Sequence, residues 1–295
     1  LSSATLPVTL AEDASAIGRI AFADVGEAGT RDIFVINADG TGLVNLTPGG
    51  GNDKNAAWSP DGSKIAFASD LDPATGLAGA DSEIFVMDAD GSNLVQLTDN
   101  QGDDQEPTWS PDGSAIAFAG ERGDEQLDIY TMNADGTNEV RLTVDSVAQD
   151  FTPSWSQNEI VFSSDRNAGN VDLWITNDDG MNLRQVTSAS SVDWYPDLSR
   201  DGTAIVYEEF SFTAGVSRQI VAVDADGGNR RVLTDEPGGS NLSPDWSPSG
   251  RYVVFYSDAD GFPGIYRMNA DGTVRILVTT VTARTGVDPS WIVSE

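Results

Sequence analysis

The chain has 295 residues, enough for one large domain or two ordinary ones. Its 47 acidic and 16 basic residues give a formal net charge of -31, so its surface disfavours nucleic acid and anionic membranes and attracts cations or basic partners. The sequence contains no histidine and no cysteine, which excludes Ser-His-Asp and Cys-His catalysis, disulfides and the commonest zinc ligands. No apolar run approaches the ~18 residues of a membrane-spanning helix, so no membrane insertion is expected.

The first predicted element is an N-terminal arm, residues 1–17. Its segment Thr5–Leu10 is typical of an extended, partly apolar strand, and Leu6, Val8 and Leu10 are the candidate partner-binding residues. Free termini are usually disordered unless they dock. The arm therefore either packs on its own domain or adds a strand to a neighbouring copy. A head-to-tail contact of the second kind that does not close on itself would generate a filament.

From residue 18 onward the sequence repeats six times. In each unit a strand-like run ends in an acidic hairpin turn, and the turn glycines lie between 44 and 51 residues apart. A period in this range is typical of a propeller or another repeat array. The six turns are Asn37–Gly40, Asp88–Gly91, Asn133–Gly136, Asn177–Gly180, Asp224–Gly227 and Asn269–Gly272.

Each unit is predicted to contain four short strands. The first carries a Trp-Ser-Pro-Asp-Gly segment, whose fullest copies lie in Trp58–Gly62 and Pro107–Gly113. The second and third strands are apolar at successive positions, as in Ile65–Phe67 and Ile84–Val86, which suits a sheet covered on both faces. The fourth is short and usually ends in Leu-Thr or Val-Thr. No window sustains a period of 3.6, so very little helix is expected.

The two ends of the repeat region complement each other. Asp288–Trp291 matches a first strand that no other strand follows, and Gly18–Phe22 matches a second strand that no first strand precedes. Pairing these ends completes a sixth blade, and the closed ring leaves no open sheet edge. The predicted fold class is therefore all-β, a six-bladed β-propeller of four-stranded antiparallel blades over residues 18–295.

The repeat units resemble the TolB-type propeller repeat. That repeat pairs a Trp-Ser-Pro-Asp-Gly hairpin with an Ile-Tyr-x-Met-Asn-x-Asp-Gly strand and a terminal Leu-Thr, and Met132–Gly136 and Met268–Gly272 match it closely. The resemblance covers roughly residues 18 to 295 and implies a six-bladed propeller. It implies no single activity, because the family includes periplasmic interaction proteins as well as propeller domains attached to serine peptidases.

One position, five residues before the tryptophan of each unit, is acidic in most repeats. The innermost strand of a propeller lines the axial channel, so these side chains are expected to form a ring at one mouth. Oxygen ligands suit Ca²⁺, Mg²⁺ or Na⁺, and Ca²⁺ tolerates irregular geometry best. The prediction is a calcium site, and the alternative is that the carboxylates cap strand or turn amides within each blade. The candidate metal ligands are Asp53, Asp104, Asp150, Asp193 and Asn241, with Gly286 at the sixth position.

Catalysis finds little support in the sequence, and no enzyme is predicted. The 295 residues contain no Gly-x-Ser-x-Gly elbow, so a peptidase domain of the kind that accompanies some such propellers is not expected among them. No spacing places two carboxylates across a substrate, which leaves a carboxylate-dependent glycosidase or lyase as the third hypothesis. Asp88–Asn93 resembles part of an EF-hand loop, but the spacing fails and a hairpin turn is the better interpretation.

The first functional hypothesis is a non-enzymatic protein-interaction or self-assembly scaffold that is stabilised by Ca²⁺. Its partners would be proteins, including copies of itself, and one form is a filament subunit that docks its arm on a neighbour. The start at Leu1, without an initial methionine, indicates a processed protein exported to the periplasm or the cell exterior, or else a shortened chain. The alternative hypothesis is a monomeric propeller that binds a basic protein or a saccharide at one face of the ring.

Overall fold

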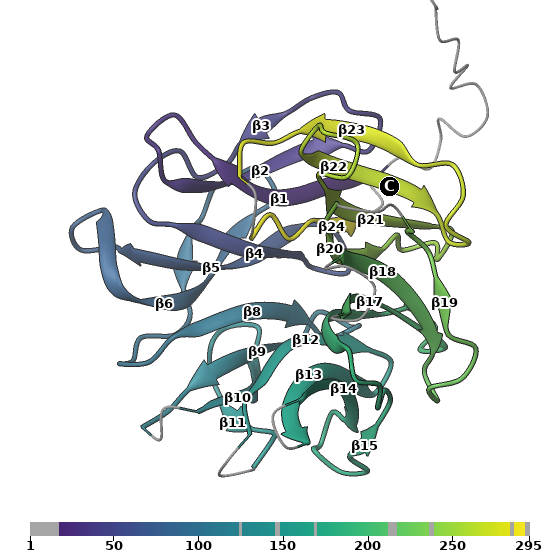
Figure 1. The fold of residues 1–295 in the computed structure, drawn as a ribbon. Coiled ribbons are helices and arrows are strands. Elements are labelled where there is room, and N and C mark those ends of the chain that lie inside the picture. Colours follow the sequence, from purple (N-terminus) through teal and green to yellow (C-terminus); the bar gives the residue numbers. More distant parts are fainter. Residues whose placement is uncertain are drawn as a thin grey trace, which may run out of the picture.

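The computed structural model describes residues 18–123, 126–144, 148–167, 170–211, 217–235, 239–283 and 286–292. These residues form 24 strands in six four-stranded sheets arranged around a central axis (Figure 1). The six-bladed propeller predicted from the repeat is confirmed, and the described residues contain no helix. The N-terminal arm, with Leu6, Val8 and Leu10, lies outside the described residues.

The blades are numbered here in chain order, and all their strand pairs are antiparallel. Blade 1 consists of β24 (Ser290–Ile292), β1 (Arg19–Val25), β2 (Arg31–Asn37) and β3 (Val44–Asn45). Blade 2 consists of β4 (Asp53–Trp58), β5 (Lys64–Asp72), β6 (Leu77–Asp88) and β7 (Val95–Gln96). Blade 3 consists of β8 (Asp104–Trp109), β9 (Ala115–Glu121), β10 (Leu127–Asn133) and β11 (Val140–Arg141).

The other three blades follow the same order. Blade 4 consists of β12 (Asp150–Ser156), β13 (Glu159–Asn167), β14 (Asn170–Asn177) and β15 (Arg184–Gln185). Blade 5 consists of β16 (Val192–Leu198), β17 (Ala204–Ser211), β18 (Ser217–Asp224) and β19 (Arg231–Val232). Blade 6 consists of β20 (Asn241–Trp246), β21 (Tyr252–Ser257), β22 (Gly264–Asn269) and β23 (Ile276–Thr280).

The two ends of the chain meet in blade 1. Strand β24 pairs with β1 between Arg19 and Ile292 and between Ala21 and Ser290, so the C-terminal strand is the innermost strand of the first blade. The backbone N–H of Ala23 adds a hydrogen bond of 2.8 Å to the carbonyl of Val287. The predicted pairing of the two ends is confirmed.

The core lies between neighbouring blades. For example, Ile33 of blade 1 packs in one buried cluster with Trp58 and Phe67 of blade 2. A middle strand must cover a cluster on each of its faces, which explains why the second and third strands are apolar at successive positions. The rings of Phe67 and Phe85, on adjacent strands of blade 2, lie 5.9 Å apart and stack.

The acidic turns between the third and fourth strands join one blade to the next. In blade 2 the N–H of Gly91 donates to the carbonyl of Asp88 at 2.9 Å, and Asp90 accepts from the N–H of Ser92 at 2.9 Å. The six turn glycines have φ between 79° and 87°. A Cβ at any of them would lie 2.6–3.0 Å from a backbone carbonyl in the outer part of the preceding blade. Glycine is therefore required both by the turn and by this close approach.

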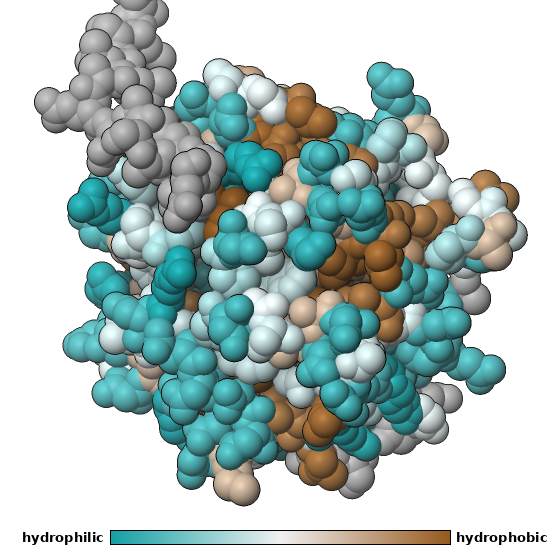
Figure 2. Space-filling view, turned by 180° about the vertical axis from the view of Figure 1, so that it is seen from behind, coloured by the Kyte–Doolittle hydropathy of each residue, from teal (hydrophilic) through white to brown (hydrophobic). Residues whose placement is uncertain are grey.

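The outer surface combines polar turns with isolated apolar side chains. Figure 2 shows separate apolar patches among hydrophilic residues on the face that it presents. The short outer strands contribute Val44, Val95 and Val140, each more than half exposed. No helix in the described part of the chain is long and apolar enough to cross a membrane.

Candidate functional site

The innermost strands surround a cavity of about 260 Å³ on the propeller axis. Five of them contain one non-glycine residue with a positive φ, between 47° and 58°, and the sixth such residue, Asp288 with a φ of 37°, lies two residues before β24. We call these six residues the inner ring, and all of them line the cavity. The inner ring consists of Asn55, Glu106, Thr152, Tyr195, Ser243 and Asp288.

A β-bulge places the inner ring in the channel. In blades 2 to 6 the pairing of first and second strands shifts register at this residue and the next one, as between Gln105 and Thr108 in blade 3. The residue that follows is proline in five blades, as at Pro107, and alanine in blade 2. Proline cannot donate a hydrogen bond to the neighbouring strand, so a bulge is a position where it is tolerated. The bulge thus leaves the inner-ring residue free of the regular ladder.

Two inner-ring residues are carboxylates that bond to neighbouring blades. Asp288 accepts hydrogen bonds from the Asn55 side-chain amide at 2.9 Å and from the Ser243 hydroxyl at 2.7 Å. Glu106 accepts one from the backbone N–H of Thr152 at 2.6 Å. All five residues are part of the wall of the central cavity. The ring therefore holds acidic oxygens in fixed positions around the axis.

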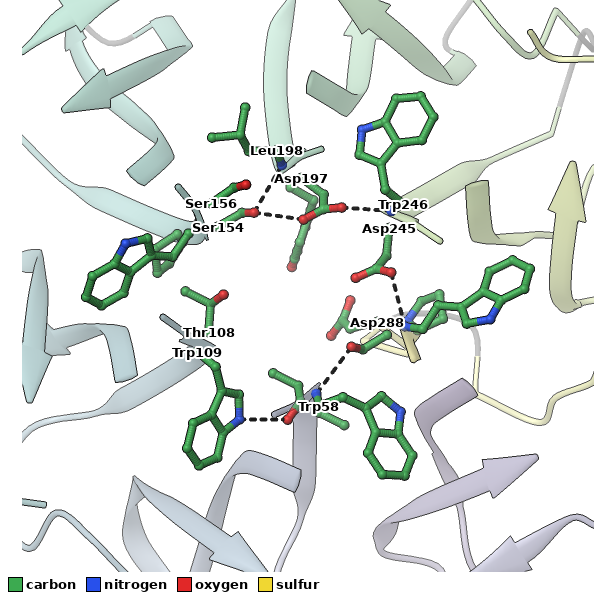
Figure 3. A pocket seen from close by; sticks show the side chains of 18 of the residues that line it. Trp58, Thr108, Trp109, Ser154, Ser156, Asp197, Leu198, Asp245, Trp246 and Asp288 are labelled. Atoms are coloured by element: carbon green, nitrogen blue, oxygen red, sulfur yellow. Dashed lines mark hydrogen bonds between the residues drawn. The ribbon is translucent and has the colours of Figure 1, made fainter. Parts of the chain in front are cut away.

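A second set of side chains, directly before the tryptophans or, in blade 5, before Leu198, forms hydrogen bonds between the blades (Figure 3). Ser154, Asp197, Asp245 and Ser290 each accept a hydrogen bond from a backbone N–H in the next blade, at 2.7–3.4 Å. The Ser154 hydroxyl also donates to Asp197 at 2.7 Å. Asp197 and Asp245 thus have a structural role, because an unpaired buried N–H would be costly.

Burial makes the channel carboxyls easier to protonate. It raises the pKa of Glu106 to about 7 and that of Asp197 to about 6. It also raises the pKa of Asp288, and for Asp245 burial together with the nearby Asp197 raises the pKa well above its usual range. A bound cation would offset the desolvation of these groups, because an opposite charge nearby favours the ionised form.

The five predicted metal ligands lie at the opposite end of the first strands, and the structure does not bring them together. All are buried between blades, with 0–3% of their surface exposed. The described residues contain no group of three or more carboxylates placed to hold a metal ion. The expectation that they converge on one open mouth is therefore wrong, because each side chain turns into its own blade interface. The residues concerned are Asp53, Asp104, Asp150, Asp193 and Asn241, and whether the protein binds calcium stays a prediction.

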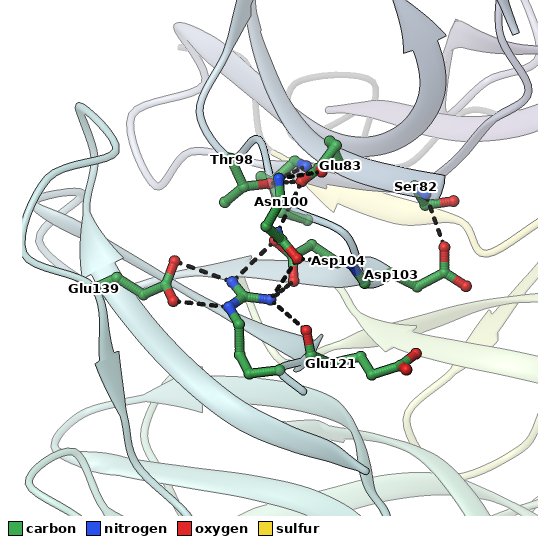
Figure 4. A network of polar contacts seen from close by, with 11 residues as sticks. Ser82, Glu83, Thr98, Asn100, Asp103, Asp104, Glu121 and Glu139 are labelled. Atoms are coloured by element: carbon green, nitrogen blue, oxygen red, sulfur yellow. Dashed lines mark hydrogen bonds and ion pairs between the residues drawn. The ribbon is translucent and has the colours of Figure 1, made fainter. Parts of the chain in front are cut away.

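Their partners differ from blade to blade. Figure 4 shows the Asp104 network, in which the Arg122 guanidinium bonds both carboxylate oxygens at 2.6 and 3.1 Å. Asp150 accepts at both of its oxygens from one nitrogen of Arg166, Nη2, at 2.7 and 2.8 Å. Asp53 instead accepts from the Ser69 hydroxyl at 2.5 Å. The amide of Asn241 donates to a backbone carbonyl at 3.3 Å.

Comparison with known proteins identifies the family. The sequence profile of the TolB beta propeller domain matches residues 122–294. An uncharacterized protein of Agrobacterium fabrum is 30% identical over 214 residues, which cover 67% of this chain and 68% of that protein. The chain belongs to the TolB β-propeller family.

More distant members of the TolB family extend this comparison. The Tol-Pal system protein TolB of Francisella tularensis is 25% identical over 242 residues, which cover 80% of this chain and 53% of that protein. The chain thus spans about half the length of these TolB relatives. The crystal structure of TolB from Acinetobacter baumannii superposes with a TM-score of 0.75 over 93% of this chain and 66% of its own, at 22% identity. That likeness shows the fold.

The inner ring of this TolB-family propeller was missed by sequence reasoning, which selected a position two residues earlier in the same strand. The inner-ring residues share neither charge nor size, so no composition pattern marks them. The signal that could have found them is the proline that follows in five of the six first strands. Proline inside a predicted strand indicates an edge or a bulge, and a bulge redirects side chains.

Proposed function

We propose that this TolB-family propeller is a protein-interaction module that receives a cationic segment of a partner protein in its central channel. The observation that carries the proposal is the convergence of acidic side chains from four blades on one cavity. The described lining contains Glu106, Asp197, Asp245 and Asp288, with Arg200 as its basic member. A lysine or arginine side chain would bring the opposite charge to this site.

The walls of the channel suit a peptide. Prolines and the half-buried rings of Trp155 and Tyr195 supply apolar surface beside the acidic oxygens. Lysine and arginine side chains have apolar stems and charged ends, so they match both features at once. Because the inner ring is set by the backbone of a closed fold, little ordering of the receptor is needed on binding.

A saccharide, the other ligand of the alternative hypothesis, is less favoured by the same geometry. Stacking against a sugar needs an exposed aromatic face. The channel tryptophans Trp58, Trp109 and Trp291 are only 5–6% exposed, because their rings pack between blades. Of the aromatic side chains in the described lining, only Trp155 and Tyr195 are partly exposed, so the channel offers more carboxylates than open aromatic faces.

The self-assembly form of the hypothesis rests on the arm, residues 1–17. These residues lie outside the described part of the chain, so contacts of Leu6, Val8 and Leu10 do not bear on the proposal. Filament formation, calcium stabilisation and export remain predictions from the sequence. Comparing the sedimentation of the full chain with that of a chain lacking residues 1–17 tests self-assembly, and equal sedimentation coefficients would contradict it.

The channel proposal is tested by titrating the protein with short fluorescent peptides that contain lysine or arginine, and with matched peptides that carry glutamine instead. We expect binding of the cationic peptides alone. Replacing Glu106→Gln or Asp288→Asn should weaken it by roughly tenfold or more, because a charge-assisted hydrogen bond is lost. Equal affinity for the cationic and neutral peptides would overturn the proposal.

The matched control is Asp178→Asn. This aspartate is exposed on the outer turn of blade 4, and its substitution removes the same charge without touching the channel. We expect unchanged peptide affinity. If Asp178→Asn weakens binding as much as Glu106→Gln does, the attraction arises from the net charge of the chain, and a specific channel site is excluded.

A further inference from the structure

At four of the six blade interfaces, two acidic side chains lie on strands that pack against each other, and the same positions at the other two interfaces hold neutral residues. The first member of each pair lies in the third strand of a blade, directly before the apolar residues of that strand. The second member is the residue of the next blade at the position that the sequence predicted as a metal ligand. At the four acidic interfaces the third strand that carries the first member packs against the first strand that carries the second, and in each pair burial and the charge of one carboxylate raise the pKa of the other. The pairs, from interface 1/2 to 6/1, are Asp32 with Asp53, Glu83 with Asp104, Asp128 with Asp150, Asp172 with Asp193, Gln219 with Asn241, and Gly264 with Gly286.

Arginine compensates the buried charge at two of the acidic interfaces. Between blades 3 and 4, Arg166 bonds both oxygens of Asp150, and Arg141 pairs with Asp128. Between blades 2 and 3, Arg122 forms a bidentate pair with Asp104. Removing carboxylates from water is unfavourable unless a cation is close, and these guanidinium groups provide it.

The interface between blades 4 and 5 has the same kind of carboxylate pair without such an arginine. Asp193 is 0% exposed, and its Oδ1 accepts from the Ser191 hydroxyl at 3.0 Å. Its Oδ2 is buried and has no hydrogen-bond partner among the described residues. Asp172, 2% exposed, accepts from the side-chain amides of Asn170 and Gln185 at 3.1 and 3.0 Å.

Arg230 of blade 5 pairs with another carboxylate, Glu209. Arg230 bonds both oxygens of Glu209 at 2.6 and 2.7 Å, so that pair adds no net charge. The repeat explains why no second arginine is present. Arg122 and Arg166 each lie four residues after the central aromatic residue of the second strand, and the residue four after Tyr207 is Ser211. The 4/5 interface therefore keeps two buried carboxylates that no arginine in the described structure neutralises.

We propose that a hard, oxygen-preferring cation binds between blades 4 and 5, on the carboxylates of Asp172 and Asp193, in the role that arginine has at the neighbouring interfaces. Ca²⁺ is the best candidate, because it accepts irregular shells of carboxylate, hydroxyl, carbonyl and water oxygens. The Ser191 hydroxyl, which donates to Asp193 Oδ1 at 3.0 Å, is a further oxygen at the site. Two protein carboxylates leave the rest of the shell to neutral oxygens.

The proposal is restricted to this interface. The pair of Asp32 and Asp53 between blades 1 and 2 also lacks an arginine on Asp53, but its oxygens are partnered differently. The Ser69 hydroxyl donates to Asp53 at 2.5 Å, and the Asn45 amide donates to Asp32 at 2.7 Å. Within the described residues, neither aspartate has a buried oxygen that lacks a hydrogen bond.

The test compares thermal unfolding of the full chain in chelator and in calcium, with calorimetric titration for stoichiometry. We expect calcium to raise the melting temperature by about 3–6 °C at saturation and to bind at a site that Asp193→Asn removes. That variant places at this position the residue that blade 6 carries naturally. The control Asp150→Asn should keep the calcium response, because the charge that it removes is paired with Arg166.

Asp193→Asn could abolish calcium binding simply by preventing folding, so a second variant that adds a positive charge is needed. Ser211→Arg introduces arginine at the position of Arg122 and Arg166, and we expect it to make the melting temperature insensitive to calcium. Calcium binding that survives in both Asp193→Asn and Ser211→Arg would overturn the proposal. So would wild-type protein whose melting temperature responds to pH but not to Ca²⁺, since a proton would then be the compensating cation.

Discussion

The two ends of the innermost strands place the same chemical group in opposite situations. At one end, Asp104 and Asp150 are fully buried between blades and each is bonded by an arginine. At the other end, Glu106 and Asp288 border the central cavity and accept hydrogen bonds from neutral donors only, as far as the described contacts show. The first arrangement uses charge to join blades. The second leaves charge directed at a space where a ligand fits.

The difference teaches that acidity by itself does not mark a functional residue in this chain. Partners and solvent access decide the role. A buried carboxylate with an arginine is part of the framework, because removing either member leaves an unpaired charge. Under the proposed function, a channel carboxylate such as Glu106 or Asp288 is a binding group, because it borders the cavity without an arginine partner in the described contacts.

Asp150→Asn should be the most damaging change. It leaves the guanidinium of Arg166, which is 9% exposed, without its counter-ion. We expect a loss of about 3–5 kcal/mol in the free energy of unfolding, measured by urea denaturation. Affinity for a cationic peptide should not change in the folded fraction. A loss below about 1 kcal/mol would mean that this ion pair contributes no more to stability than an exposed pair does. The proposed difference between the two ends of the innermost strands would then not hold.

Ser154→Ala tests the hydrogen bonds that join the innermost strands of neighbouring blades. The hydroxyl accepts from the N–H of Leu198 and donates to Asp197, so the substitution leaves a buried donor unpaired. We expect a loss of about 1–3 kcal/mol in the free energy of unfolding. Thr108→Ala is the matched control, since no hydrogen bond of this kind joins Thr108 to the next blade in the described contacts. Equal losses for both variants would contradict the assignment.

The pH dependence of stability follows from the raised pKa values of the channel carboxyls. The native state binds protons more tightly than the unfolded chain, so the free energy of unfolding should rise as pH falls from about 8 through the pKa of Glu106, about 7, and that of Asp197, about 6. The gain ends near the unfolded values of 4.5 and 3.8. Because the chain lacks histidine, no imidazole opposes this trend. A melting temperature that falls steadily on acidification from neutral pH would contradict it.

Glu106→Gln should have the smallest effect on stability and the clearest effect on its pH dependence. It replaces an ionisable group with a neutral one of similar size, so we expect a slight increase in the free energy of unfolding at about pH 8. The rise of the melting temperature on acidification should become smaller. Thermal scans at several pH values measure both. An unchanged pH profile would show that Glu106 is solvated like a surface residue.

The architecture could be predicted almost completely from the sequence. Turn spacing, successive apolar residues in strands such as Ile65–Phe67, and the complementary ends around Gly18 and Trp291 all report local geometry that each repeat must satisfy. The candidate site could not be predicted in the same way. The position of Asp104 was identified by its spacing, but its pairing with Arg122 joins residues on different strands. The spacing of the repeats also did not indicate that the bulge two residues after Asp104 places the side chain of Glu106 at the central cavity.

The sequence by itself determined a six-bladed ring, because a repeated hydrophobic pattern can bury its surface only against copies of itself. It also determined the turns, whose backbone requires glycine. Only the tertiary structure decided which carboxylates are neutralised by arginine, which remain without one between blades 4 and 5, and which face the central cavity. Charge compensation and solvent access depend on neighbouring side chains that only folding brings together. The sequence of one repeat does not show which side chains of the next repeat will lie beside it.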